Sequence, residues 1–198
     1  MKIMMFEGNS RFSAIPEPAF TTLPDSALML SGRPYFIPEF DSEFEAYISP
    51  VVKIDRLGKS IAPKFASRYY HQMSVALSMR PKNLVAKLRA AGLPDSLALV
   101  YDRAVIVGDF IPVGEMPADK ETIQKIELCV DGELMLLWKA SDMKISIGDA
   151  LELCSRHNTL KTGDLIAYAL SDKGTTLRRP STITVKADGR ELLTTNIR

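Results

Sequence analysis

Short apolar runs separated by turn residues dominate the chain, and many of them are rich in β-branched or aromatic residues, which favours strands. The runs that predict strands are residues 2–6, 34–37, 47–54, 69–79, 104–107, 123–130, 133–138, 165–170, 182–186 and 191–197. Asp131-Gly132 and Asp188-Gly189 each separate two of these runs and are typical of two-residue hairpin turns. Pro50 lies inside the run 47–54. Because proline has no N–H to donate, we expect an edge strand or a bulge there.

Two segments have apolar residues at helical spacing, residues 83–91 and 146–158. Gly92 follows the first segment and is typical of a helix C-terminus. Ser146 and Asp149 can form a capping box at the start of the second. A shorter helical segment is predicted at 62–67. Together, these strands and helices predict a strand-dominated α+β fold with a few short helices.

Composition and charge do not change the predicted fold, but they exclude nucleic acid and membrane as partners. The 198 residues are 46% hydrophobic and 25% charged, which is ordinary for a globular domain. The 25 basic and 24 acidic residues leave a net charge of +1, so no overall field attracts nucleic acid or an anionic membrane. No apolar run approaches the ~20 residues of a membrane span. Two cysteines, Cys129 and Cys154, are too few for a disulfide framework. We therefore expect a cytoplasmic protein with no nucleic-acid or membrane partner.

Few residues suggest chemistry by themselves. Glu43 and Glu45 would place two carboxylates on one face of a strand, as many cation sites do. His71 has the titration range of a general base, but no acid is visibly paired with it in the sequence. Cys154 and His157 share a predicted helix face, but no second Cys/His pair completes a zinc site. Packing or surface roles are favoured for His71, Cys154 and His157.

Several segments are similar to the fumarylacetoacetate hydrolase family. They are PDSALML at 24–30, RPYFIPEF at 33–40, VVKIDRLGKSI at 51–61, YDRAVIVGDFI at 101–111, DGELMLLWKASDM at 131–143 and LKTGDLI at 160–166. The resemblance covers nearly the whole chain and implies a mixed β-sheet roll. Residues 1–40 would form a small N-terminal segment packed on a main domain of residues 41–198, and the family usually forms homodimers. Family members cleave carbon–carbon bonds in acylpyruvates and fumarylacetoacetate, or decarboxylate, hydrate or isomerise related β-diketo acids. They use Mg²⁺, Mn²⁺ or Ca²⁺.

The resemblance also implies where the metal ligands should lie. The family has a Glu-x-Glu pair directly before the run that matches VVKIDRLGK, and an Asp in the segment that matches ALSMRPKNL. Alignment without gaps places Tyr47, Ser49 and Ser78 at these three positions. A hard cation requires anionic oxygen, so a phenol and two hydroxyls predict no metal and no metal cofactor. Glu43 and Glu45 lie four residues upstream, about 13 Å along a strand, and are interpreted as a solvated edge before it.

Other reactive positions of the family have changed as well. Its Arg-Asn-Tyr motif and a nearby His correspond to Gly8–Ser10 and Ser13, its Lys to Leu99, and its Gly-Thr-Pro to Tyr168–Leu170. Together these changes predict a catalytically inactive member. Arg11, Arg80 and Lys82, which fall in the aligned segments, could attract the carboxylate of a small organic acid.

Three functions remain open at this point. The first is an inactive family member, a pseudoenzyme, which binds a small carboxylic acid or regulates an active paralogue in a mixed dimer. The second is a divergent acylpyruvate- or fumarylacetoacetate-type hydrolase or isomerase, whose site would be rebuilt from Glu45, Asp102 or Asp109. The third is a structural dimerisation module without a ligand.

Overall fold

The computed structural model describes residues 1–115 and 122–198. Its strands are β1 Lys2–Glu7, β2 Ala19–Pro24, β3 Leu28–Leu30, β4 Phe44–Ile54, β5 Tyr70–Pro81, β6 Val105–Val107, β7 Ile111–Pro112, β8 Lys125–Val130, β9 Glu133–Lys139, β10 Leu165–Ala167, β11 Thr175–Thr176, β12 Ser181–Ala187 and β13 Arg190–Ile197. Its α-helices are α1 Lys82–Ala90, α2 Ser96–Leu99 and α3 Ile147–His157, and short 3-10 turns lie at Asp25–Ala27, Pro63–Arg68, Val113–Glu115 and Ala140–Asp142. None of the helices in these ranges is long and apolar enough to cross a membrane.

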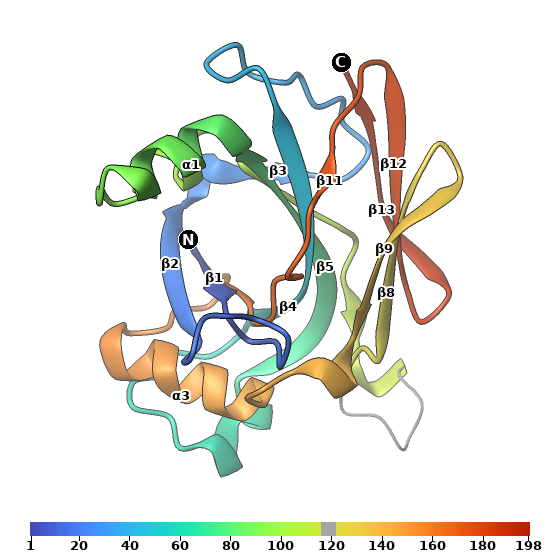
Figure 1. Ribbon diagram of the computed structural model, residues 1–198. Coiled ribbons are helices and arrows are strands. Elements are labelled where there is room, and N and C mark those ends of the chain that lie inside the picture. Colours follow the sequence, from blue (N-terminus) through green and yellow to red (C-terminus); the bar gives the residue numbers. More distant parts are fainter. Residues whose placement is uncertain (116–121) are drawn as a thin grey trace.

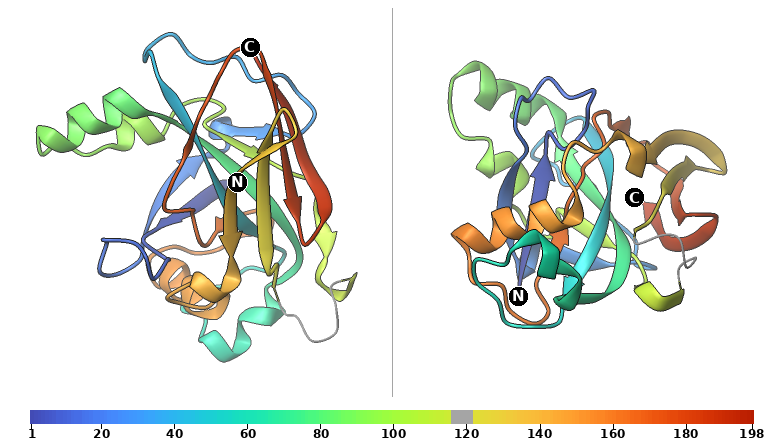
Figure 2. Two further views of the ribbon diagram at one scale, coloured as in Figure 1. Left: turned by 45° about the vertical axis from the view of Figure 1, so that its right-hand side comes forward. Right: turned by 90° about the horizontal axis from the view of Figure 1, so that it is seen from below.

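The strands of the described residues form two curled sheets that lie against each other (Figures 1 and 2). The nine-stranded sheet has the order β2-β1-β10-β4-β5-β6-β3, with β11 paired to β4 and β7 to β5. The four-stranded sheet has the order β13-β12-β8-β9. β1 runs parallel to β10 and β3 parallel to β6, while the other pairs are antiparallel, so the larger sheet is mixed. The strand-dominated α+β prediction is therefore confirmed, and the first 40 residues supply β1, β2 and β3 to this sheet.

Alternation along the strands divides the apolar residues of the larger sheet between its two faces. Met4, Ile48 and Leu77 belong to the main core, which includes residues of the smaller sheet and α3. Met5 and Ala76 belong to a second apolar cluster, which also contains residues of β6 and β10. Each strand therefore presents its even and odd positions to different surroundings, and this alternation decides which polar side chains can meet.

Local signals in the sequence locate several elements correctly. The capping box at α3 is present, with the Ser146 hydroxyl accepting from the Asp149 N–H and the Asp149 carboxylate accepting from the Ser146 N–H. Gly92 adopts the predicted positive φ, +67°, just after α1. Asp131-Gly132 and Asp188-Gly189 both have positive φ, as two-residue hairpin turns of this type require.

The strand predicted at residues 34–37 is absent. The segment instead runs beside the end of β13, where the Tyr35 N–H donates to the Asn196 carbonyl at 2.8 Å and the Ile37 N–H to the Arg198 carbonyl at 2.9 Å. Only Tyr35 forms a bridge, with Ile197. Pro34 and Pro38 flank the segment and cannot donate, which limits the pairing.

Pro50 lies in a central strand, contrary to the expected edge or bulge. It falls within the continuous β4–β5 pairing, and its carbonyl accepts from the Tyr168 N–H at 3.3 Å on the side of β10. The missing Pro50 donor would have faced the Tyr168 carbonyl, since N–H and C=O of one residue point to the same side of an antiparallel strand. The Asn9 side-chain amide donates to that carbonyl at 2.7 Å instead. Asn9 thus supplies the hydrogen bond that proline cannot make.

We predict that Asn9→Ala lowers the free energy of unfolding by about 2–4 kcal/mol, because buried backbone groups lose their partners. Asn9 is 1% exposed, and its amide also bonds the Ile145 carbonyl and accepts from the N–H groups of Lys144 and Ile145. Urea denaturation measures the change, with Asn83→Ala, whose amide bonds exposed partners, as the control.

A double variant tests the specific role of Asn9. Pro50→Ala restores a backbone N–H opposite the Tyr168 carbonyl, so it should be less destabilising in the Asn9→Ala background than in the wild type. Equal effects in both backgrounds would show that Asn9 does not replace the proline donor.

Candidate functional site

The three aligned metal-ligand positions come together on one face of the larger sheet. Tyr47 on β4 lies directly opposite Ser78 on β5, and Ser49 lies two residues further along β4. Two-residue periodicity places all three side chains on the face of the second apolar cluster, together with Val51 and Ala76. The structure therefore brings the aligned positions into one place.

The two serines at these positions are uncharged and already bonded. Ser49 is fully buried, and its hydroxyl donates to the Pro50 carbonyl at 3.0 Å and accepts from the Ala169 N–H at 3.3 Å. The Ser78 hydroxyl lies 3.4 Å from Nε of Arg80. Neither serine offers the anionic oxygen that a hard cation prefers.

Tyr47 fills the remaining position with an aromatic ring. Its hydroxyl donates to the Glu45 carboxylate at 2.8 Å, and the Arg80 guanidinium lies over the ring at 5.1 Å from the centroid. A Cβ on Gly174 would lie only 2.6 Å from the ring, so the glycine provides room for it. Burial, and then the Glu45 carboxylate, raise the pKa of Tyr47 to about 12, which keeps the phenol neutral.

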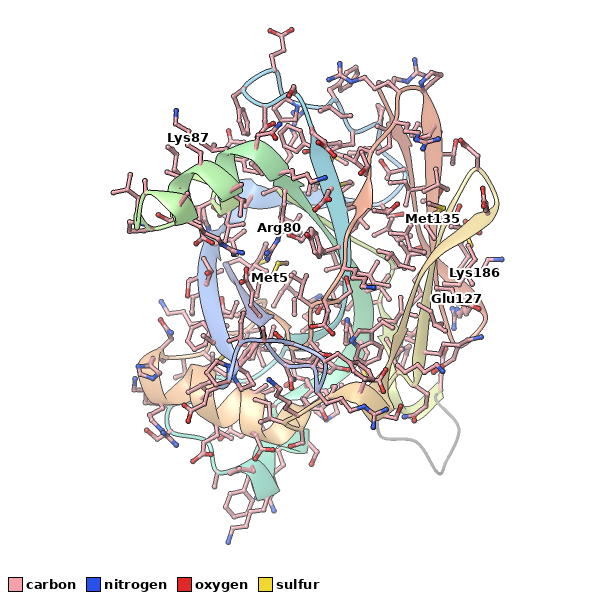
Figure 3. All side chains as sticks on the ribbon, in the orientation of Figure 1. Met5, Arg80, Lys87, Glu127, Met135 and Lys186 are labelled. Carbon is pink, nitrogen blue, oxygen red and sulfur yellow. The ribbon has the colours of Figure 1, made fainter. Side chains whose placement is uncertain are left out.

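An ion pair occupies the centre of this site. Nη1 of Arg80 lies 2.7 Å from Oε1 of Glu7, the last residue of β1, and these side chains are 11% and 21% exposed. Arg89 on α1 lies 3.5 Å from the same carboxylate and also pairs with Asp95 at 2.7 Å. In Figure 3, Arg80 and Met5 lie inside the roll, near β1 and β5. The positive charge at the aligned ligand positions thus belongs to a side chain.

Secondary structure explains why Arg80 and Arg89 reach the same carboxylate. β5 continues directly into α1, whose N-cap position is Pro81 without a side-chain bond. Asp41, from the loop before β4, accepts from the Leu84 N–H at 2.7 Å and caps the helix from outside. Hydrogen bonds to the carboxylate lower the pKa of Asp41 despite its burial cost. This anchoring holds α1 beside the site.

A cavity of about 140 Å³ lies next to the ion pair. Its walls include Glu7, Tyr47, Arg80, Arg89 and Asp172. A cavity of ~150 Å³ holds a molecule of the size of benzene, so a small organic acid would fit here. The walls carry two cations, Arg80 and Arg89, and two carboxylates, Glu7 and Asp172.

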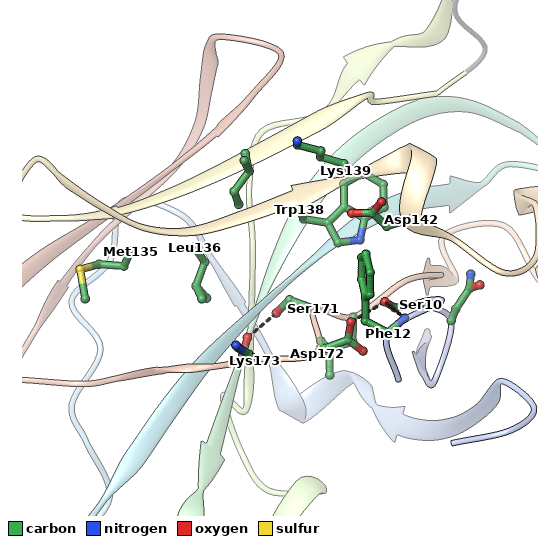
Figure 4. A pocket seen from close by; sticks show the side chains of 13 residues that line it. Ser10, Phe12, Met135, Leu136, Trp138, Lys139, Asp142, Ser171, Asp172 and Lys173 are labelled. Carbon is green, nitrogen blue, oxygen red and sulfur yellow. Dashed lines mark hydrogen bonds between the residues drawn. The ribbon is translucent and has the colours of Figure 1, made fainter. Parts of the chain in front are cut away.

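A larger cleft of about 540 Å³ lies beside this cavity and shares the segment Leu170–Asp172 with it (Figure 4). Phe12 and Trp138 form part of its apolar wall, and the Ser10 hydroxyl donates to the Asp172 carboxylate. The segments aligned with the family's Arg-Asn-Tyr and Gly-Thr-Pro motifs therefore meet here, although they are far apart in the sequence.

Glu43 and Glu45 both form ion pairs with Lys82. Nζ of Lys82 lies 2.7 Å from the Glu43 carboxylate and 3.4 Å from that of Glu45, which raises the pKa of Lys82. β4 already begins at Phe44, so Glu45 lies inside the strand and is 19% exposed. The interpretation of this residue as a solvated edge before the strand was wrong, because β4 extends further than its apolar run.

The other proposed site residues lie apart from the cavity. Arg11 pairs with Asp142 and is more than half exposed. Asp102 and Asp109 are exposed and absent from the cavity walls. His71, exposed on β5, pairs through Nδ1 with Asp55, a partner that the sequence had not indicated.

Sequence reasoning missed Glu7, Arg89 and Asp172. Glu7 directly precedes the segment aligned with the family's Arg-Asn-Tyr motif, which is a usable signal. Arg89 and Asp172 had no signal, because their proximity depends on how α1 and the loop after β10 pack.

The residues at the aligned positions do not fit a divalent cation. They offer a phenol and two bonded hydroxyls, and a guanidinium lies among them. In residues 1–115 and 122–198, no group of three or more His, Cys, Asp or Glu side chains is placed to hold a metal. Cys154 on α3 is also unsuited, since burial raises the pKa of its thiol to about 12.

Comparisons with known proteins agree with this fold. Oxaloacetate tautomerase YcgM of Escherichia coli is 26% identical over 183 residues, which cover 92% of this chain and 83% of the relative. The mitochondrial oxaloacetate tautomerase FAHD1 of Rattus norvegicus is 27% identical over 156 residues, covering 79% and 70%. No family model matches the chain.

A solved structure of fumarylpyruvate hydrolase from Pseudomonas aeruginosa, in complex with Mn²⁺ and pyruvate, superposes with a TM-score of 0.88 at 20% identity. It covers all of this chain and 89% of that one. A Yersinia pestis structure assigned to the fumarylacetoacetate hydrolase family superposes with a TM-score of 0.89 at 23% identity, covering 100% and 92%. The chain is thus similar to the fumarylacetoacetate hydrolase family in sequence, at 26–27% identity to these relatives, and shares the family's fold.

We predict that Tyr47→Phe removes one late-titrating tyrosine, detected by tyrosinate absorbance during an alkaline titration. A pKa raised from 10.0 to about 12 on folding favours the neutral phenol in the native state. The stability that this preference for the neutral Tyr47 phenol contributes is therefore complete below pH 10 and is lost as the pH rises towards 12. The variant should lose less stability than the wild type over that range, and an unchanged pH dependence would contradict the assignment.

Proposed function

We propose that this protein does not perform divalent-metal chemistry and uses the cavity beside Arg80 to bind a small carboxylic acid. The observation that carries the proposal is the Arg80 guanidinium among Tyr47, Ser78 and Glu7, where relatives would require a set of carboxylate ligands. Without that set, an ion that chelates substrate oxygens has no carboxylate ligand at the three aligned positions.

Two guanidinium groups on the cavity wall are the basis for proposing an anionic ligand. Arg80 and Arg89 both face the cavity, and a guanidinium can bind a carboxylate with two parallel hydrogen bonds. The Pseudomonas aeruginosa relative was solved with pyruvate, a small 2-oxo acid. Small 2-oxo acids and dicarboxylic acids are therefore the ligand class to examine. Of the cations named from sequence, Arg80 fits this role, whereas Lys82 is held by Glu43 and Glu45 and Arg11 lies elsewhere.

Thermal-shift measurements test ligand binding. We predict that pyruvate, oxaloacetate or oxalate raises the melting temperature of the wild type, because a ligand that binds only the native state stabilises it. Arg80→Gln should abolish the shift. Arg190→Gln is the matched control, since this arginine pairs with Glu115 on the surface, outside the cavity.

Calorimetry with Mn²⁺ and Mg²⁺ tests the loss of metal chemistry. The wild type should show no binding in the micromolar range and no acceleration of oxaloacetate tautomerisation or acylpyruvate cleavage. Tight Mn²⁺ binding together with either activity would support the alternative function, a hydrolase or isomerase with a rebuilt site. If neither metal nor acid binds, the structural module would be the better description.

A dimer, of this chain or with an active paralogue, is the second part of the proposal. β9 is an edge strand of the smaller sheet, and its Leu134, Met135 and Leu137 are 46–52% exposed. Apolar side chains on an unpaired edge favour pairing with another chain.

We predict that Leu134→Lys with Leu137→Lys converts a dimer to a monomer in light scattering. A wild-type monomer would exclude homodimerisation, and a dimer unaffected by both changes would exclude this edge.

A further inference from the structure

We infer that the Arg80 guanidinium takes the place of the divalent ion, so that Arg80 itself excludes a metal from this site. The inference rests on the proposed function, because it explains why the wild type should bind no ion. It also goes further, since it assigns the exclusion to a side chain that is not one of the three aligned ligand positions.

Arg80 lies on the same face of the sheet as the aligned ligand positions. Arg80 lies two residues after Ser78 on β5, so strand alternation directs both side chains to the same face. Its guanidinium extends back over these positions, with Nε 3.4 Å from the Ser78 hydroxyl and its central carbon 5.1 Å from the centre of the Tyr47 ring. The side chain is only 11% exposed, so its charge is held within the site.

Glu7 is the ion-pair partner of Arg80. The Glu7 carboxylate lies 2.7 Å from Nη1 and balances the guanidinium charge. Its Oε1 is buried and has no hydrogen bond of good geometry in the part of the chain that the structure describes, so the contact is mainly electrostatic. A partly buried carboxylate requires a nearby cation, and Arg80 supplies it as a fixed part of the chain.

The charge of Arg80 would affect any carboxylate introduced at the aligned positions. Carboxylates introduced at positions 47, 49 and 78 would lie beside a guanidinium and form ion pairs with it. A divalent cation would then have to compete with Arg80 for the same oxygens and would be repelled by its charge. Restoring the ligands alone should therefore be insufficient, and removing Arg80 should be required as well.

A grafting experiment tests this consequence. One variant carries Tyr47→Glu, Ser49→Glu and Ser78→Asp, and a second carries the same three changes with Arg80→Thr. Calorimetry with Mn²⁺ should give a Kd roughly 100-fold lower for the second variant, because the competing cation is gone. The first variant with Arg190→Thr is the matched control and should bind as weakly as the first variant alone.

The outcomes separate this inference from the proposed function. If the three-carboxylate variant with Arg80 intact binds Mn²⁺ as tightly as the variant without it, the inference is overturned while the proposed function stands. If the wild type binds Mn²⁺ tightly, the proposed function fails first, and the inference fails with it.

Chemical rescue keeps the inference testable if the grafted variants do not fold. Arg80→Ala leaves the Glu7 carboxylate beside the space that the guanidinium occupied. Low millimolar guanidinium should raise the melting temperature of this variant, because the free ion restores the charge, and should not raise that of Arg190→Ala. Failure of guanidinium to stabilise Arg80→Ala more than Arg190→Ala would contradict the inference.

Discussion

The antiparallel pairing of β4 with β5 determines which side chains share the cavity. In this register Tyr47 lies opposite Ser78, and Glu45 lies opposite Arg80. A shift of one residue would turn these side chains towards the main core and would expose Ile48 and Leu77, which are fully buried there. The apolar residues of the two strands therefore hold the polar ones in place, and the chemistry of the site depends on hydrophobic packing.

Side chains of the protein balance the charges around this site. Lys82 neutralises Glu43 and Glu45, while Arg80 and Arg89 neutralise Glu7. A carboxylate shielded from water is unfavourable unless a cation is close, and each of these carboxylates has one within the chain. The Pseudomonas aeruginosa structure was solved with Mn²⁺, a mobile ion, whereas the cations around this cavity belong to side chains and cannot exchange.

The fold is shared with structures of low sequence identity. The Pseudomonas aeruginosa structure superposes over the whole chain at only 20% identity. Such agreement is expected where alternating apolar positions define the sheets, because many apolar residues satisfy the same pattern. Site chemistry has no such tolerance, since replacing a carboxylate by a hydroxyl removes the charge that a cation needs.

The sequence by itself determined the elements whose signals are local. Apolar runs rich in β-branched residues predicted β4 and β5, Asp188-Gly189 predicted the turn of the final hairpin, and Ser146 with Asp149 predicted the start of α3. The resemblance placed Tyr47, Ser49 and Ser78 at aligned positions, and strand periodicity put Tyr47 and Ser49 on one face, whereas Ser78 joins them only through the β4–β5 pairing. These properties depend on neighbours a few residues apart, which a sequence displays directly.

Only the tertiary structure decided the contacts between distant segments. It paired Glu7 with Arg80, placed Arg89 beside the same carboxylate and gave Pro50 a substitute donor in Asn9. It also kept Arg11 away from the cavity. Such contacts depend on strand order and on the docking of α1, which are set by the burial of the whole apolar surface. No local pattern encodes them, because each partner is chosen by the packing of elements far apart in the chain.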